Sequence, residues 1–323
     1  MPHKLLYLSR ADVEAVGPPM GRIVELLEEA FREKGMGRVE MPPKPGVHPR
    51  PDAFIHAMPA YIPATGAVGV KWVSGYPENP KRGLPYIGGL IILNDPDTGL
   101  PCCVMDATWV TAKRTGAASA LAAKYLARMD SETMGVLGCG VQGRVHVEAM
   151  RELFPIKKIY AYDIDPEALR RYAEEVEGQF GVEVVPVEKP RDAVEPADIV
   201  VTAGPIRKNP EPGIERDWLK PGGFACPVDF DSYWKPEALA QLDKYATDDV
   251  AQYRYYRSVG YFRRAPEPYA DLGEIVVGEK PGREREDERT MSMNLGLALD
   301  DIALAPKVYR RAKDMGIGTW LLL

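Results

Sequence analysis

Cysteine is scarce in this chain of 323 residues. The four cysteines include no CxxC pair. Neither the cysteines nor the four histidines have the spacing of metal ligands. The cysteines are Cys102, Cys103, Cys139 and Cys226. We therefore expect reduced, buried thiols and no metal site, and the length excludes a disulfide-stapled miniprotein.

Long apolar runs, an excess of positive charge and any short sequence period are also absent. No window approaches the ~18 apolar residues of a membrane span, and charges enter the first residues too early for a secretory signal. Lys and Arg number 41 against 47 Asp and Glu, so no global field attracts nucleic acid or anionic lipid. The 30 glycines and 30 prolines follow no period. We expect a soluble, cytoplasmic protein with no nucleic-acid partner and no membrane partner.

The composition is that of a folded chain of about two domains. Hydrophobic residues make up 45% and charged residues 27%, enough to build a sizeable core. An apolar helical face predicts a helix over residues 21–35 that ends at Gly35. Apolar runs separated by Pro and Gly then predict strands within 53–62, 67–76 and 87–95. The first hundred residues therefore read as mixed α+β with a sheet.

Residues 108–128 predict an Ala-rich helix with one face of small residues, Gly116, Ala120, Ala123 and Ala127. From about residue 130, strands alternate with helices, which indicates βαβ units and a parallel sheet. A long helical segment over 293–316 is expected to be interrupted at Pro306. The last residues, TWLLL, form a candidate strand that returns to the first sheet.

The fold class is therefore α/β: a Rossmann-type doubly wound parallel sheet plus an α+β domain formed by the N- and C-terminal segments. We place the α+β domain at residues 1–128 and 305–323, and the dinucleotide-binding domain at residues 129–304.

A GxGxxG pattern follows the first strand of the second region. Its glycines are Gly138, Gly140 and Gly143, with a predicted strand before them and a helix from Val141 after them. A second strand ends at Asp163, where a carboxylate accepts hydrogen bonds from ribose hydroxyls and repels a 2′-phosphate. The arrangement predicts binding of NAD(H) rather than NADP(H). Asp165, followed by Pro, is the expected N-cap of the next helix.

Four segments resemble the ornithine cyclodeaminase and mu-crystallin family, which includes alanine dehydrogenases and ketimine reductases. They are GVKWVSGYPENPKRGLP (69–85), DATWVTAKRTGAASALAAKYLAR (106–128), GVLGCGVQGRVH (135–146) and GLALDDIALAPKVYRRAKDMGIG (296–318). The resemblance implies a homodimer with a Rossmann domain inserted into the α/β domain that forms the interface and the substrate pocket.

The resemblance also implies roles for single residues. Lys71 and Arg114 match cationic residues that face the substrate carboxylate, and Lys71 interrupts an apolar run, where it needs an anion or a shifted pKa. Arg114 can also touch the cofactor, and Asp231 matches the catalytic aspartate, with Asp229 as its competitor by spacing. Further cofactor contacts are expected from Thr115, Val141, Gln142, Thr202, Val228 and Lys235.

The chain departs from the family at three positions near the expected substrate. Lys44 stands where many members have an arginine, His56 where ornithine-cyclising members have a glutamate, and Tyr86 where a threonine is common. Without that glutamate, ornithine cyclisation is disfavoured. His56 can serve as an acid or base, or as a hydrogen-bonded structural residue.

The sequence therefore predicts an NAD(H)-dependent amino-acid dehydrogenase or imine reductase. Its substrates would be an amino acid, an oxo acid plus an amine, or a cyclic imine. The alternatives are an ornithine cyclodeaminase-type lyase and a mu-crystallin-like ligand-binding protein. An aromatic cluster over 253–262 is expected in a helix and loop near the cleft or interface, where it could admit a bulky substrate.

Overall fold

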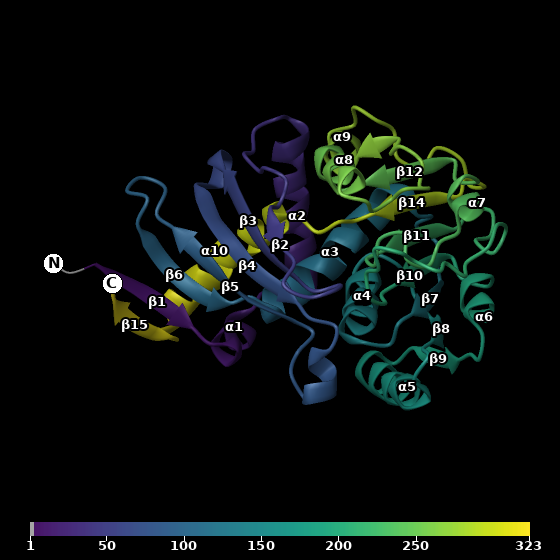
Figure 1. Cartoon of the computed structure of the whole chain (residues 1–323), viewed down its shortest axis with the longest axis horizontal. Helices are drawn as coiled ribbons and strands as arrows, with labels where there is room; N and C mark the ends of the chain where they lie inside the picture. The colour runs from purple at the N-terminus through teal and green to yellow at the C-terminus, as the bar shows by residue number, and fades with distance from the viewer. Residues whose placement is uncertain (1–2) are drawn as a thin grey trace. The chain divides into compact units, whose positions relative to one another are not determined.

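The computed structural model describes residues 3–323. The chain forms two compact units: the first contains the chain up to Arg114 together with Leu297–Leu323, and the second is Thr115–Gly296. The first unit has a seven-stranded mixed sheet and the second an eight-stranded parallel sheet, which confirms the predicted fold class (Figure 1). The domain boundaries that we placed at residues 128 and 305 from the sequence remain a prediction of where the functional domains begin and end.

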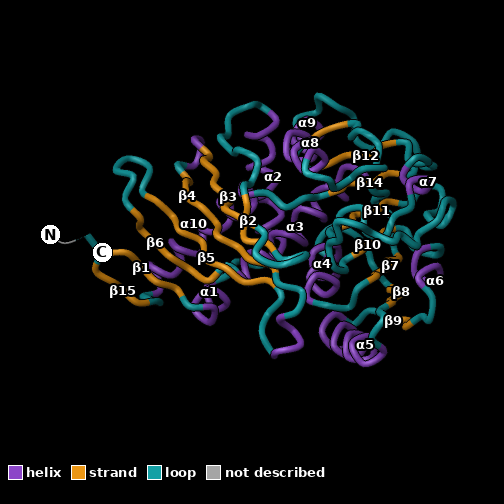
Figure 2. The backbone as a smooth tube through the Cα atoms, viewed as in Figure 1, coloured by secondary structure: helices purple, strands orange, loops and turns teal. Residues whose placement is uncertain are grey.

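The sheet of the first unit has the strand order β15-β1-β6-β5-β4-β3-β2 (Figure 2). Its strands are β1 (Lys4–Leu8), β2 (Gly46–Val47), β3 (Phe54–Ile62), β4 (Ala67–Gly75), β5 (Ile87–Asn94), β6 (Pro101–Asp106) and β15 (Thr319–Leu322). The helices are α1 (Arg10–Val16), α2 (Met20–Gly35), α10 (Ala298–Met315) and the start of α3 (Thr108–Leu126), with single 3₁₀ turns at Pro63–Thr65 and Asn79–Arg82. The predicted helix and strands of this region are confirmed.

The last strand returns to the first sheet, as predicted. β15 pairs antiparallel with β1, so segments from opposite ends of the chain are neighbours in one sheet. Helix α10 packs against β3, β4 and β5 and against α2 (Figure 1). The expected interruption at Pro306 is wrong, because α10 continues through this proline. Burial of Leu304, Ala305 and Val308 on either side holds the helix together although one backbone hydrogen bond is lost.

The sheet of the second unit has the order β13-β12-β14-β11-β10-β7-β8-β9. Its strands are β7 (Thr133–Leu137), β8 (Lys158–Tyr162), β9 (Glu183–Pro186), β10 (Ile199–Thr202), β11 (Phe224–Pro227), β12 (Lys244–Thr247), β13 (Ala270–Asp271) and β14 (Thr290–Met293). The helices are α4 (Val141–Arg151), α5 (Pro166–Phe180), α6 (Pro190–Val194), α7 (Pro236–Leu239), α8 (Val250–Ser258), α9 (Leu272–Val276) and the remainder of α3. Asp165 caps α5 through the Glu167 N–H, as predicted.

Strand β14 corrects the reading of the segment that starts at Met293. That residue ends a buried strand between β11 and β12, and α10 begins only at Ala298. The strand has only four residues, and its Ser292 hydroxyl bonds to Asn294 rather than to solvent. Such a short strand, buried on both faces, has no alternating pattern to reveal it.

The small-residue face of α3 lies against α4. A Cβ atom on Gly116 would lie 2.9 Å from the carbonyl oxygen of Val145, so only glycine permits this approach. One turn later, the Ser119 hydroxyl lies 2.9 Å from Nε2 of His146, and both residues are buried. The predicted close approach is confirmed.

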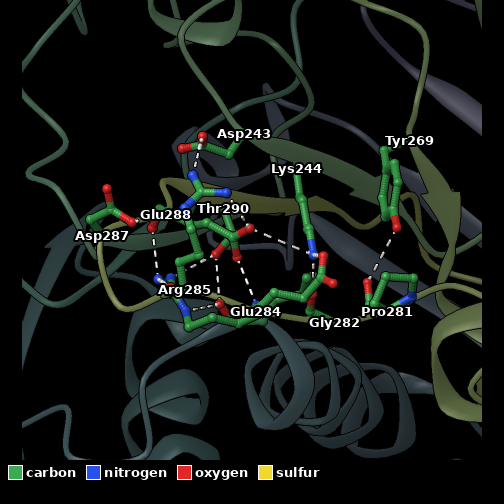
Figure 3. A network of polar contacts seen from close by, with 12 residues as sticks. Asp243, Lys244, Tyr269, Pro281, Gly282, Glu284, Arg285, Asp287, Glu288 and Thr290 are labelled. Atoms are coloured by element: carbon green, nitrogen blue, oxygen red, sulfur yellow. Dashed lines mark hydrogen bonds and ion pairs between the residues drawn. The ribbon is translucent and has the colours of Figure 1, made fainter.

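A polar network closes the amino-terminal edge of this sheet. Lys244, the buried first residue of β12, binds Glu284 at 2.6 Å and lies 3.7 Å from the buried Glu288 (Figure 3). Arg285 binds both Glu288 and Asp243 (Figure 3). The network fixes the loop between α9 and β14 on the edge opposite to the carboxyl ends of the strands.

The aromatic cluster over 253–262 belongs mainly to the core of the second unit. Tyr253, Tyr256 and Phe262 are buried, and Phe230 packs on Tyr256 and Phe262. Tyr253 stacks on Phe262 with ring centroids 4.5 Å apart. The cluster therefore supports the segment around Phe262 rather than forming an open aromatic surface.

Across residues 3–323, no helix has the length and apolar character needed to cross a membrane.

Candidate functional site

Lys71 lies in the middle of β4 with its ammonium group buried on the face that α10 covers. The side chain is 1% exposed, and Nζ lies 2.6 Å from Oδ2 of Asp301 in the first turns of α10. Burial is the main reason that the pKa of Lys71 falls to about 8, and the nearby Arg114 lowers it further. The Asp301 carboxylate opposes both effects. Lys71 is therefore a buried cation held by one carboxylate, as the apolar run around it predicted.

Arg114 joins the same cluster from α3. Its Nη1 lies 3.3 Å from Oδ2 of Asp300, and its Nε lies 3.2 Å from Oδ1 of Asp301. Both aspartates are fully buried, and burial raises the pKa of Asp300 to about 6. The structure thus brings together the two cations that the resemblance assigned to the substrate carboxylate.

Sequence reasoning missed Asp300 and Asp301. The available signal was two consecutive carboxylates at the start of an apolar helical run, Leu297–Ala305, where burial of a charge requires a cation. Pairing with residues 71 and 114 could not be read from the sequence, because these positions are far apart along the chain.

His56 and Lys44 lie beside this cluster. His56 is opposite Val73 and Met58 is opposite Lys71 in the β3–β4 ladder, so His56 and Lys71 point to the same face. Burial, followed by the charge of Lys44, lowers the pKa of His56 to about 3. The imidazole stacks on Phe54 with ring centroids 4.4 Å apart. His56 is therefore a neutral, packed residue at pH 7. Tyr86 follows the second 3₁₀ turn and precedes β5.

The glycine fingerprint has the geometry expected of a dinucleotide site. Gly138 has φ +104°, and a Cβ on Gly143 would lie 2.5 Å from the carbonyl oxygen of Gly138. Over Gly140, by contrast, a Cβ would meet nothing within 4 Å. Gly140 is the N-cap of α4, and no side chain caps the helix there. Free N–H groups, open space and the positive end of the helix dipole thus coincide, which fits a pyrophosphate.

Two further residues of the fingerprint flank this space. Val141 is exposed, and Oε1 of Gln142 is buried without a hydrogen-bond partner among the described residues. Asp163 lies directly beside them: Oδ2 accepts the Cys139 N–H at 2.7 Å and Oδ1 accepts the Asp165 N–H at 2.9 Å. The carboxylate is thus held at the end of β8, next to the glycines, where a ribose would bind.

Asp229 ties the carboxyl ends of β10 and β11 together. Its Oδ1 accepts the Thr202 hydroxyl at 2.7 Å, its Oδ2 accepts the Gly204 N–H at 2.9 Å, and the residue is fully buried. Burial raises the pKa of Asp229 to about 7. The N–H of Val228 donates to the Thr202 carbonyl in the same connection. Both oxygens of Asp229 are therefore occupied within the protein.

Asp231 differs from Asp229 in that it lines a pocket of about 230 Å³. Burial raises the pKa of the Asp231 carboxyl group, and the backbone near Phe262 opposes this rise. Phe230 and Phe262 have left-handed backbones, with φ of 60° and 50°. Each such non-glycine residue costs about 1–2 kcal/mol, and strain of this kind concentrates at functional sites. Among the two aspartates, only Asp231 lines this pocket.

The remaining predicted cofactor contacts have varied surroundings. Lys235 precedes α7 and binds Glu215 at 2.6 Å, and Thr115 is half-buried within α3. The part of the chain that the structure describes holds no group of three metal-ligating side chains. All four cysteines are free, and Cys102 differs from the expectation because it is only half-buried.

Known proteins resemble this chain over nearly its whole length. The model of the ornithine cyclodeaminase/mu-crystallin family matches residues 6–316. The chain is 37% identical over 320 residues to a nodulation efficiency protein of Rhizobium meliloti, covering 97% of each chain. It is 36% identical to the Δ1-pyrroline-2-carboxylate reductase of Thermococcus litoralis, solved with NADH and L-proline (TM-score 0.88; 98% and 99% covered). An archaeal alanine dehydrogenase dimer with bound NAD is 32% identical (TM-score 0.88; 99% of each covered).

Proposed function

The chain belongs to the ornithine cyclodeaminase/mu-crystallin family, and we propose that it transfers hydride between a nicotinamide and the α-carbon of an amino acid or its imine. The protein is accordingly an NAD(H)-dependent oxidoreductase acting on CH–NH₂ or C=N groups. The similarity to the pyrroline-2-carboxylate reductase and the alanine dehydrogenase over nearly the whole chain supports this assignment.

The observation that carries the proposal is the buried cluster of cations in the first unit. Lys71 and Arg114 are held in place by ion pairs with Asp300 and Asp301, and the buried Lys44 lies close enough to His56 to lower its pKa. Cations that are fixed in this way can bind the carboxylate of a substrate through charge-assisted hydrogen bonds. An α-amino acid, an oxo acid and a cyclic imino acid all provide this group.

The residues around the fingerprint fit NAD(H). The three glycines, Val141 and Gln142 would hold the pyrophosphate at the start of α4, and Asp163 would hold the ribose hydroxyls. When bound, the cofactor accepts or supplies the hydride. Asp163 repels a 2′-phosphate, so NADH is preferred to NADPH. The proposal keeps the other expected contacts, Arg114, Thr115, Thr202, Val228 and Lys235.

Within this mechanism, the chain's own residues bind the substrate and handle its proton. Lys71 and Arg114 orient the carboxylate, and Asp301 keeps the Lys71 ammonium charged and in place. The Asp231 carboxylate would accept a proton from the substrate amine, or return it, and would stabilise a cationic imine. Asp229 holds the turn that presents Asp231.

Ornithine cyclisation is not part of the proposed activity. A second ammonium group of the substrate would need an anion at position 56, and the residue there is a neutral imidazole. A purely ligand-binding role is also disfavoured, because it would not need Asp231 in an accessible pocket together with the buried cations. A cytoplasmic location, expected from the sequence, stays a prediction.

We also propose a homodimer formed by the first unit. Trp72 and Leu90 are directly paired across β4 and β5, on the face opposite to Lys71, and are 50% and 42% exposed. Tyr7 continues the same face on β1. Large apolar side chains aligned across several strands favour burial against a second copy.

The proposed activity is tested with a panel of substrates. Oxo acids with amines, and cyclic imines, should oxidise NADH, and amino acids should reduce NAD⁺, as measured by the absorbance of the reduced nicotinamide. NADH should bind more tightly than NADPH. Proline should not appear from ornithine with catalytic NAD⁺. Failure of every substrate with a protein that binds NADH would reject the proposed reaction.

A further inference from the structure

The pocket beside Asp231 carries more positive charge than the proposed reaction at the α-carbon requires. It lies within the second unit, between the loop around Lys208, the turn after β11 and the segment Gly260–Ala265. Its lining includes Lys208, Arg263 and Arg264. Within the described residues, no carboxylate lies within ion-pair distance of these three side chains.

Two of these cations, Lys208 and Arg263, converge on the same glycine. A Cβ atom on Gly260 would lie 3.1 Å from Nη2 of Arg263 and 3.2 Å from Cε of Lys208, so both side chains lie over the same glycine. Nε of Arg263 donates to the Gly260 carbonyl at 3.0 Å, which fixes the guanidinium there. The Lys208 ammonium lies 5.9 Å from the centre of the Tyr261 ring. Lys208 and Arg263 are exposed and repel each other, and an anion bound between them would relieve this repulsion.

The same segment is coupled to the candidate catalytic carboxylate. Phe262 lines the same pocket as Asp231, its backbone influences the pKa of that carboxyl group, and the next two residues supply the arginines. The backbones of both Phe262 and Phe230 are in the left-handed region. The two rings pack against each other, with their centroids 4.9 Å apart. These two strained residues therefore fix the backbone that carries Arg263 and Arg264 relative to Asp231. The volume of about 230 Å³ holds a short carboxylic acid chain, since a water molecule takes ~30 Å³.

We propose that this pocket binds a second carboxylate of the substrate, so that the preferred substrates are oxo acids and amino acids with an acidic side chain. The proposal rests on the proposed function and specifies its substrate class. Arginine suits the site because its planar guanidinium forms paired hydrogen bonds with a carboxylate. Asp231 contributes one negative charge against three positive charges, so the pocket stays net positive.

The test compares two substrates of equal chain length, 2-oxoglutarate and 2-oxopentanoate, each with methylamine and NADH. The wild-type protein should have the higher kcat/KM with 2-oxoglutarate. In Arg263→Gln and Lys208→Gln the ratio of the two kcat/KM values should fall by about tenfold, the scale of one lost charge-assisted hydrogen bond. Arg191→Gln, an exposed arginine that pairs with Glu195 on α6, is the matched control and should keep the ratio.

Other outcomes of this experiment would contradict the second-carboxylate proposal. A wild-type ratio near one, or a ratio that the variants leave unchanged, overturns the proposal. Weaker NADH binding by the variants overturns it as well, because the cations would then serve the cofactor. Pyruvate with glycine in place of methylamine shows whether the second carboxylate is instead carried by the amine.

Direct binding separates this proposal from the proposed reaction. Calorimetry without cofactor should show that glutarate binds more tightly than butyrate to the wild-type protein, and that Arg263→Gln loses the difference. If no substrate turns over but glutarate keeps its advantage in the wild-type protein only, the proposed reaction is wrong and the proposed anion site is supported. If turnover occurs and glutarate has no advantage, only the anion site is wrong.

Discussion

Asp229 and Asp231 are two residues apart but occupy different environments. Asp231→Asn should lower turnover by about 10²-fold or more, because a positioned acid or base of this kind contributes that factor. NADH binding should survive, and one limb of the pH-rate profile should disappear. Steady-state kinetics and cofactor titration provide the measurements.

Asp229→Asn should act mainly on stability. The amide has one acceptor oxygen, so either the Thr202 hydroxyl or the Gly204 N–H loses its partner, at a cost of about 1–3 kcal/mol in unfolding free energy. The assignment of the two roles fails if a folded Asp229→Asn protein binds NADH but does not turn over while Asp231→Asn remains active.

Lys71 should make carboxylate binding depend on pH. Its pKa is lowered to about 8 by burial, so the ammonium is charged below that pH and loses its proton above it. Affinity for the substrate carboxylate should therefore fall as the pH rises through about 8. Asp301 favours the charged form, so Asp301→Asn should move this loss to lower pH. The dissociation constant of a carboxylate inhibitor, measured across pH, tests both statements, and an unchanged limb in Asp301→Asn would contradict the positioning role.

At the scale of the element, His146 links α4 to α3. Nδ1 lies 2.8 Å from the Gln142 carbonyl, which can only accept, so Nδ1 carries the proton and Nε2 accepts the Ser119 hydroxyl. The histidine is completely buried, and burial lowers its pKa to about 4 from an ordinary 6.5. The helix that begins at the glycine fingerprint is thus anchored by a neutral imidazole.

This anchor predicts a loss of stability in mild acid. As the pH falls from 6.5 to 4, the unfolded chain binds a proton that the folded chain does not, so folding loses up to about 3 kcal/mol. Above 6.5 the contribution is complete. His146→Asn should be less stable at pH 7 but should show a shallower fall over this window. Denaturant unfolding at several pH values measures it, and equal slopes for the two proteins would show that His146 is not responsible.

At the scale of the whole molecule, the exposed face of the first sheet predicts the oligomeric state. The protein should have the mass of a dimer in light scattering after size-exclusion chromatography. Trp72→Glu with Leu90→Glu should produce a monomer, because two charges would have to be buried at the interface. Met129→Glu changes an exposed apolar residue of the second unit and should leave the dimer intact. A wild-type monomer would exclude the proposed interface.

Local patterns predicted much of the fold and part of the site. The strand, glycines and Asp163 follow one another closely, so their geometry was readable from spacing. Lys71 was identified because a charge interrupted an apolar run. Asp300 and Asp301 were not, because their partners lie on β4 and α3, and β14 is too short for a pattern. The convergence of Lys208 and Arg263 over Gly260 depends on two separate loops, which no sequence spacing encodes.

The pairing of β15 with β1 has a consequence for how the polypeptide reaches its native state. The first sheet cannot be completed, and α10 cannot cover Lys71, until the chain has passed through all of Thr115–Gly296. Contacts between such distant segments carry a large loop-closure entropy and form slowly, whereas the second unit is continuous in sequence. During synthesis, the parallel sheet should therefore form first. The cation cluster should assemble only in a late step, once α10 has left the ribosome.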